Sequence, residues 1–368
     1  MKSLAKIPPG VRYFFGEEVK KRRVIEQQVL SVFAAWSYEE IILPIFDYHN
    51  LFALGMGQEA AKHTYRFLDS DGELLALRPD LTSLVARTIA THFTESPRPI
   101  RLCYNGEVFR YREAHKQKPH DYHQLGLEHI GNDRLEADLE VLLIAIEALS
   151  RLGMSDFLIV LSHVNFFNGI AEYLNLNIDE IANFHSLVDK KNSSLLSKFL
   201  SSKLNQEENN RLSNLFRMMG KADILEQAFS FSSYNEKIVN ALMDLTGILE
   251  IAENLDIANY LKIDLGDVQG LDYYTGMTFK IYASGVGSAI GSGGRYDSLL
   301  KNFEVEDSAV GFQLSLDLLA TTLKNISLSD SSKYLLSASQ DLAKMFQEAK
   351  KLRQENKQIE ITDRIIKN

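Results

Sequence analysis

The stretch from Arg101 to Ile130 reads RLCYNGEVFRYREAHKQKPHDYHQLGLEHI. Its first part, Arg101–Tyr111, and its last part, Tyr122–Ile130, have the apolar content and length of two strands. The polar residues Arg112–Asp121 between them predict a connecting loop. We therefore expect two long neighbouring strands here.

The second of these strands has a polar face. Gln124, Gly126 and Glu128 lie on one side of it, because side chains alternate with a period of two along a strand. A buried glutamine and glutamate are costly without partners. This face therefore predicts a bound polar ligand, with the gap at Gly126 leaving room for it, and Arg110 nearby can pair with a carboxylate or phosphate. A solvated sheet face explains the same pattern equally well.

The rest of the chain indicates an α+β protein. We expect long helices over residues 16–36 and 137–152, shorter ones over 80–89 and 314–324, a hairpin over 65–77, and strands over 38–44, 157–161, 271–284 and 308–313. Antiparallel strands with segregated helices favour an antiparallel sheet flanked by helices. The predicted core covers residues 1–325 and includes a helical insertion at about 169–261. A β-α-β fragment within 330–368 is too small to cover both faces of its own sheet.

Composition limits the class of protein. The chain has 368 residues, 45% of them hydrophobic and 24% charged, and one cysteine, Cys103. A single cysteine excludes an internal disulfide and a cysteine-based zinc cluster. No apolar run has the length of a membrane span or the form of a signal peptide, so we expect a cytoplasmic protein with no membrane partner. The net charge of -9 argues against tRNA as a partner. We predict neither a metal nor a cofactor.

Three further stretches carry polar or glycine residues that suit a ligand site: Leu77–Thr82 (LRPDLT), Gln269–Gly276 (QGLDYYTG) and Gly291–Asp297 (GSGGRYD). The first is also explained as an ordinary helix start, with a proline in the first turn and an acid favourable to the helix dipole. The other two let backbone approach a small molecule, although tight turns explain them about as well. None has the Gly-Lys-Ser/Thr ending of a phosphate loop.

Taken together and in their order along the chain, the four stretches resemble the catalytic domain of class II aminoacyl-tRNA synthetases, specifically that of histidyl-tRNA synthetase. The strand ending at Pro44 is similar to the first, dimer-forming motif, and Phe109–Glu128 to the second motif with its histidine-binding strand. Ala309–Phe312 resembles the opening of the third motif. The resemblance covers about residues 8–325.

This sequence departs from the synthetase pattern where the resemblance implies chemistry. Gln269 stands where the synthetase has an arginine bridging the histidine carboxylate and the α-phosphate, and Leu318 where an arginine clamps the γ-phosphate. Losing one charged donor of this kind costs about 10²–10³-fold in rate. Asp80 is shorter than the acid expected there, the usual Glu-Arg pair reads Arg112-Glu113, and the C-terminal fragment is much smaller than an anticodon-binding domain. We therefore expect no synthetase activity and no catalytic residue.

The amino-acid pocket is retained. By the resemblance, the α-amino group of histidine is held by Asp80, Thr82 and Gln124, the imidazole by Glu128 and Tyr274 with Tyr273 beside them, and the carboxylate by Arg110. An imidazole needs two polar partners to be recognised at both nitrogens.

In keeping the amino-acid pocket while losing the residues for synthetase activity, this chain resembles the regulatory subunits of ATP phosphoribosyltransferase. That resemblance implies a short-form catalytic subunit as partner, self-association as a class II dimer, a role in the first step of histidine biosynthesis, and histidine as feedback effector. Two alternatives stay open: an active histidyl-tRNA synthetase with unusual substitutions, and a histidine-binding protein with another partner.

Overall fold

The two strands predicted around the polar face form the middle of the fold. In this computed structural model, which describes residues 6–57, 61–111, 119–268, 274–323, 333–337 and 341–362, they are β5 (Ile100–Phe109) and β6 (Asp121–Ile130). They pair antiparallel over their whole length, with Gln124 opposite Gly106 and Glu128 opposite Leu102. The chain divides into two compact units, Met1–Lys324 and Asn325–Asn368.

The first unit is built on an eight-stranded sheet in the order β1-β5-β6-β11-β10-β9-β7-β8. The other strands are β1 (Glu39–Glu40), β7 (Phe157–His163), β8 (Leu261–Ile263), β9 (Met277–Ala283), β10 (Gly291–Arg295) and β11 (Ala309–Ser315). All pairings from β5 to β7 are antiparallel, and only the edge strands β1 and β8 join in parallel. The predicted α+β class is confirmed.

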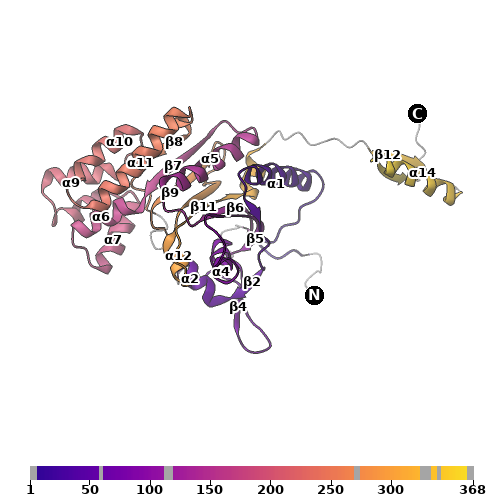
Figure 1. Cartoon of the computed structure of the whole chain (residues 1–368), viewed down its shortest axis with the longest axis horizontal. Helices are drawn as coiled ribbons and strands as arrows, with labels where there is room; N and C mark the ends of the chain where they lie inside the picture. The colour runs from indigo at the N-terminus through magenta and orange to yellow at the C-terminus, as the bar shows by residue number, and fades with distance from the viewer. Residues whose placement is uncertain are drawn as a thin grey trace. The chain divides into compact units, whose positions relative to one another are not determined.

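One face of this sheet is covered by α1 (Glu17–Ala35), α5 (Leu135–Arg151) and α13 (Leu316–Thr322). Figure 1 shows α1 and α5 of this layer. Phe33 of α1 meets Phe312 of β11 edge to face, with ring centroids 5.8 Å apart. Aromatic pairs prefer this geometry. All three helices were predicted, because their apolar residues recur at helical spacing.

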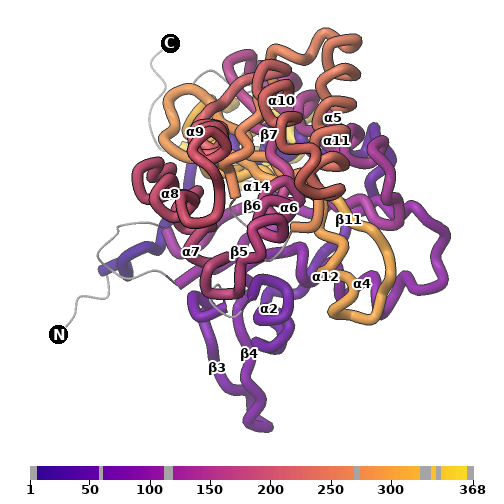
Figure 2. The backbone as a smooth tube through the Cα atoms, turned by 90° about the vertical axis from the view of Figure 1, so that its left-hand side faces the viewer, coloured from indigo at the N-terminus to yellow at the C-terminus, as the bar shows by residue number. Residues whose placement is uncertain are grey.

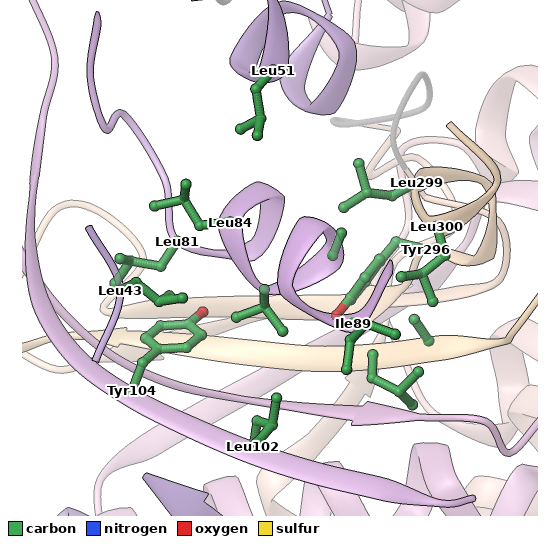
Figure 3. Close-up of a cluster of buried hydrophobic side chains, with 14 of the residues drawn as sticks. Leu43, Leu51, Leu81, Leu84, Ile89, Leu102, Tyr104, Tyr296, Leu299 and Leu300 are labelled. Atoms are coloured by element: carbon green, nitrogen blue, oxygen red, sulfur yellow. The ribbon is translucent and has the colours of Figure 1, made fainter. Parts of the chain in front are cut away.

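The opposite face lies under α4 (Thr82–His92), with α2 (His49–Met56) and α12 (Asp297–Lys301) beside it. Figure 3 shows this core, where Leu84 and Ile89 of α4 lie above Leu102 and Tyr104 of β5. Burying such side chains contributes about 1.5–3 kcal/mol each. The predicted ligand side of β6 faces this layer.

A second, three-stranded sheet has the order β2-β4-β3, formed by β2 (Phe46–Tyr48), β3 (Arg66–Leu68) and β4 (Leu74–Leu77). The hairpin of β3 and β4 was predicted correctly, whereas β2 was not predicted. The expected strand at 38–44 is largely wrong, because only Glu39–Glu40 is a strand. Beyond it, the carbonyls of Leu43 and Pro44 accept hydrogen bonds from Arg78 Nη1 at 2.7 and 3.3 Å, and so bind a side chain instead of a strand.

The predicted helical segment is confirmed in character. It comprises α6 (Val164–Tyr173), α7 (Ile178–Asp189), α8 (Ser193–Leu200), α9 (Gln206–Leu215), α10 (Ala222–Ala228) and α11 (Glu236–Asn254). This segment lies beside β7 and β8 in Figure 1, and Figure 2 shows it from another side. Its asparagines have a structural cause, since Asn177, Asn192, Asn205 and Asn235 each cap a helix with the side-chain oxygen. Asparagine is among the preferred residues at this position.

The second unit contains β12 (Lys333–Ser337), α14 (Leu342–Gln354) and β13 (Gln358–Thr362), with the two strands parallel. The predicted β-α-β fragment is thus present. Its small core consists of Leu336, Ala349 and Leu352, with Ile359 packed against them. Among the described residues of both units, no helix is long and apolar enough to cross a membrane.

Candidate ligand-binding site

Glu128 is the centre of the candidate site. Its side chain rises from β6 toward α4, and the residue is only 2% exposed. Three hydroxyl groups donate to its carboxylate: Thr82 at 2.8 Å, Tyr104 at 3.1 Å, and Tyr296 through a short hydrogen bond to the other oxygen. In Figure 3, the hydroxyl ends of Tyr104 and Tyr296 point toward the space between them.

Burial governs the charge of this carboxyl group. Loss of solvation raises the pKa of Glu128 from 4.5 to about 7, although the three hydroxyl donors act in the opposite direction. Among the described residues, no lysine, arginine or histidine forms an ion pair with Glu128. Within the described part of the chain, the ionised form therefore has no partner cation of the kind that normally accompanies a buried carboxylate.

A small cavity of about 50 Å³ lies against this carboxylate. That exceeds the space one buried water needs, about 10–15 Å³. Its walls are Thr82, Tyr104, Glu128, Tyr274, Ser292, Gly293, Tyr296, Gly311, Phe312 and Gln313. The cavity therefore lies between α4 and four strands of the sheet, with Tyr274 as a further part of its wall.

Sheet register explains how the carboxylate is accommodated beside the cavity. Gly311 lies opposite Glu128 in the β6–β11 ladder, and Gly294 lies opposite Gly311 in the next. Two adjacent strands thus carry no side chain beside the carboxylate. In the neighbouring row, Gln313 donates to Ser292 Oγ at 3.3 Å and closes the other end with polar groups.

The expectation that Gly126 leaves room for a ligand is wrong. A Cβ atom at this position would lie 2.5–2.6 Å from the ring and hydroxyl of Tyr104, so the glycine accommodates that tyrosine and not a ligand. Tyr104 faces Gly126 across the β5–β6 ladder. At Gly311, one strand further along, the volume that a side chain would need is occupied by the Glu128 carboxylate.

Of the predicted site residues, Thr82, Glu128 and Tyr274 are brought together around the cavity. Burial is the main cause that raises the pKa of Tyr274, and the nearby Glu128 adds to it, so its phenol stays protonated. Gln124 lies on the same face of β6 and is 9% exposed, but it does not line the cavity. Tyr273, like Gln269 and the Arg112-Glu113 pair, lies outside the described residues.

Asp80 and Arg110 lie just before the cavity, at the start of α4. Asp80 accepts from the backbone N–H of Ser83 at 2.8 Å and from its hydroxyl at 3.1 Å, which is the helix-start role considered above. Burial raises the pKa of Asp80, and the Arg110 guanidinium lowers it. Arg110 Nε donates to the Pro79 carbonyl at 2.9 Å.

The tight-turn interpretation of Gly291–Asp297 is wrong, since Gly291–Arg295 forms β10 inside the sheet. Arg295 points to the opposite face, where Nη2 pairs with buried Asp138 at 3.0 Å. It also donates to the carbonyls of Asn132 and Arg134. These bonds anchor the start of α5, so Arg295 is structural in this arrangement.

Sequence reasoning missed Tyr104 and Tyr296 as site residues. The signal for Tyr104 was present, because it shares the period-two face of β5 with Leu102 and Gly106, which pair with Glu128 and Gln124. Tyr296 follows β10 directly. Its role depended on recognising the glycine stretch as a strand.

The fold and the Glu128 site define a protein of the histidyl-tRNA synthetase class. The family model described as histidyl-tRNA synthetase matches residues 10–319. A histidyl-tRNA synthetase from Nostoc has the same fold, with a TM-score of 0.81 over 100% of this chain and 88% of that one at 20% identity.

Within that class, curated relatives carry a more specific name. The ATP phosphoribosyltransferase regulatory subunit of Geobacter sulfurreducens is 34% identical over 87% of this chain and 73% of its own length. That of Caldanaerobacter subterraneus is 36% identical over 84% and 81%. The chain belongs to the family of ATP phosphoribosyltransferase regulatory subunits.

A solved structure agrees with this family. The protein described as an ATP phosphoribosyltransferase regulatory subunit/histidyl-tRNA synthetase from Bacillus halodurans superposes with a TM-score of 0.87 at 28% identity. The match covers 98% of this chain and 93% of that one.

Proposed function

We propose that this chain is a non-catalytic regulatory subunit of ATP phosphoribosyltransferase and that histidine binds in the Glu128 cavity. The observation that carries the proposal is a buried carboxylate that has no ion pair with a cation in the described part of the chain and that lines a polar cavity, in a chain whose curated relatives are named regulatory subunits.

The chemistry of the cavity suits an imidazole. A carboxylate offers about four acceptor positions, and three hydroxyl groups already donate to Glu128. One position remains for an N–H of the ligand, while the Tyr274 phenol lies in the wall of the same cavity and offers a second polar group. An imidazolium would also bring a positive charge next to Glu128 and favour the ionised carboxylate.

The synthetase reaction is proposed to be lost. Adenylate formation relies on fixed positive charge around the phosphates, yet positions 269 and 318 hold glutamine and leucine. Leu318 lies in the first turn of α13, where its backbone N–H donates to Ser315 Oγ. The leucine side chain at 318 carries no charge and so cannot neutralise a phosphate.

We further propose that the chain self-associates through the region around Pro44. Three apolar residues there are exposed: Ile42 by 94%, Ile45 by 55% and Phe46 by 52%. Exposed apolar groups that cluster mark interaction surfaces. A second copy of the chain is the proposed occupant, as the first motif of class II synthetases implies, and the short-form catalytic subunit is the proposed partner of the resulting assembly.

The test is phosphoribosyl-ATP formation by a cognate short-form catalytic subunit, with and without this chain, while histidine is titrated. Turnover that rises with the chain and falls with histidine supports the proposal. Turnover that ignores the chain, beside a folded catalytic subunit, contradicts it. Histidine-dependent ATP–pyrophosphate exchange by the chain alone would instead indicate an active synthetase.

A further inference from the structure

The helical segment of the first unit holds the stretch of chain that leads into the ligand cavity. This stretch, residues 263–268, runs from the end of β8 to the residue before Gln269, and the chain re-enters the described structure at Tyr274 in the cavity wall. Its buried members include Leu265 and Val268. The position of residues 263–268 therefore restricts the position of Tyr274 in the cavity wall.

Residues from the helical segment bond to this stretch at three points. Gly220 and Ile263 exchange two backbone hydrogen bonds, at 3.1 and 2.7 Å. Lys191 Nζ donates to Asp264 at 2.5 Å. His185 Nε2 on α7 donates to the Val268 carbonyl at 2.8 Å.

The packing at these points is close. A Cβ atom at Gly266 would lie 2.0 Å from the carbonyl oxygen of Phe216, so the backbone itself meets the helical segment there. The His185 ring is fixed against Phe167 edge to face, with centroids 6.0 Å apart. On the other side, Asp267 pairs with Lys280 of β9 at 2.6 Å.

We propose that His185 is a positioning residue for the ligand cavity. His185 holds the Val268 carbonyl and so fixes the chain six residues before Tyr274. The position of α7 is therefore coupled to the position of the cavity wall. Any partner that moves α7 then changes ligand affinity, and by linkage the ligand changes the stability of α7. The ligand part of this inference rests on the proposed histidine site.

The test compares His185→Phe, which keeps the ring volume and removes the donor, with His185→Gln, which keeps a donor. We expect His185→Phe to weaken histidine binding by about threefold to tenfold in calorimetry, the equivalent of one net hydrogen bond. His185→Gln should restore most of the affinity. The matched control is Tyr234→Phe, which removes a hydrogen bond to Glu208 inside the helical segment, away from residues 263–268, and should bind as the parent does.

A second readout needs no ligand. In the free protein, amide hydrogen exchange over Tyr274–Ala283 should be faster in His185→Phe than in Tyr234→Phe. If His185→Phe does not fold, Lys191→Gln removes the neighbouring tether from a partly exposed position and should accelerate the same exchange.

Unchanged exchange and unchanged affinity in His185→Phe would overturn the proposal, as would equal losses in His185→Gln or in the control. If the unmodified chain does not bind histidine, the proposed function fails, while the exchange experiment still tests the role of His185 separately.

Discussion

Glu128 of β6 lies directly opposite Gly311 of β11, and a Cβ atom at position 311 would lie 1.8 Å from the Glu128 carboxylate. The same atom would lie 2.4 Å from the Leu127 carbonyl oxygen. The carboxylate therefore occupies the volume that any other residue at 311 would need. This pairing of a glycine with a buried acid creates the candidate site.

Gly311→Ala should displace Glu128 and abolish histidine binding, while destabilising the fold by about 1–3 kcal/mol through overpacking. Calorimetry and urea unfolding measure the two effects. Gly287→Ala is the matched control, since a Cβ atom there meets nothing within 4 Å, and it should leave both quantities unchanged. Normal histidine binding by Gly311→Ala would contradict the assignment of the cavity.

Glu128→Ala should abolish histidine binding but leave the fold and the self-association intact. The substitution removes the acceptor of three hydroxyl groups together with the charge that an imidazole would meet. Calorimetric titration gives the affinity, with circular dichroism and sedimentation as checks on folding and association. An affinity equal to that of the parent chain would rule out this pocket.

Stability should fall as the pH rises from about 4.5 to about 7. The folded-state pKa of Glu128 is raised to about 7 from 4.5, so below pH 4.5 the group is neutral in both states and costs nothing. Above pH 7, the folded state holds an unfavourable buried charge, worth about 3 kcal/mol from the two pKa values. Urea unfolding at pH 5 and pH 8 should show this loss in the parent and not in Glu128→Gln. Identical pH profiles would contradict the burial argument.

Arg295→Met should destabilise the fold by about 3–5 kcal/mol, because it leaves Asp138 buried without its cation. Arg295→Met combined with Asp138→Asn should recover part of that loss. The matched control is Lys237→Met, whose ion pair with Glu172 is about half exposed and should cost less than about 1 kcal/mol. Thermal or urea unfolding measures all three, and equal effects at the two sites would refute the structural role of Arg295.

Ile42→Asp should weaken self-association by placing a charge in the proposed apolar interface, without affecting the monomer, since Ile42 is 94% exposed. Sedimentation velocity across micromolar concentrations measures the change. Glu39→Lys supplies a charge change at another exposed residue nearby as a comparison. A parent chain that is monomeric at micromolar concentration would disprove the interface itself.

The sequence allowed prediction of single elements better than of contacts between them. Period-two alternation placed Gln124 and Glu128 on one face of a strand, and that face is correct. Alternation within one strand cannot show which neighbour fills a gap, so the space at Gly126 was assigned to a ligand, although Tyr104 occupies it. Cross-strand register decides such contacts, and it forms only when distant segments pair.

The strand at Gly291–Arg295 escaped prediction for a related reason. Glycines usually mark turns, but here they allow three strands to pack closely beside the cavity. A Cβ atom at Gly293 would lie only 2.4 Å from the Gly311 carbonyl oxygen. The strand expected near Pro44 failed for a different cause. Arg78, remote from it in sequence, binds the carbonyls that a neighbouring strand would have used.

That arginine has a consequence for the proposed self-association. Arg78 is 6% exposed and holds Leu43 and Pro44 by their backbone, so the neighbouring apolar side chains are displayed by a segment that is already fixed. Association costs free energy when loops must become ordered, and a preorganised surface avoids that cost. A second chain would therefore bind a surface that needs no further ordering. The entropic cost of ordering this segment arises when the single chain folds.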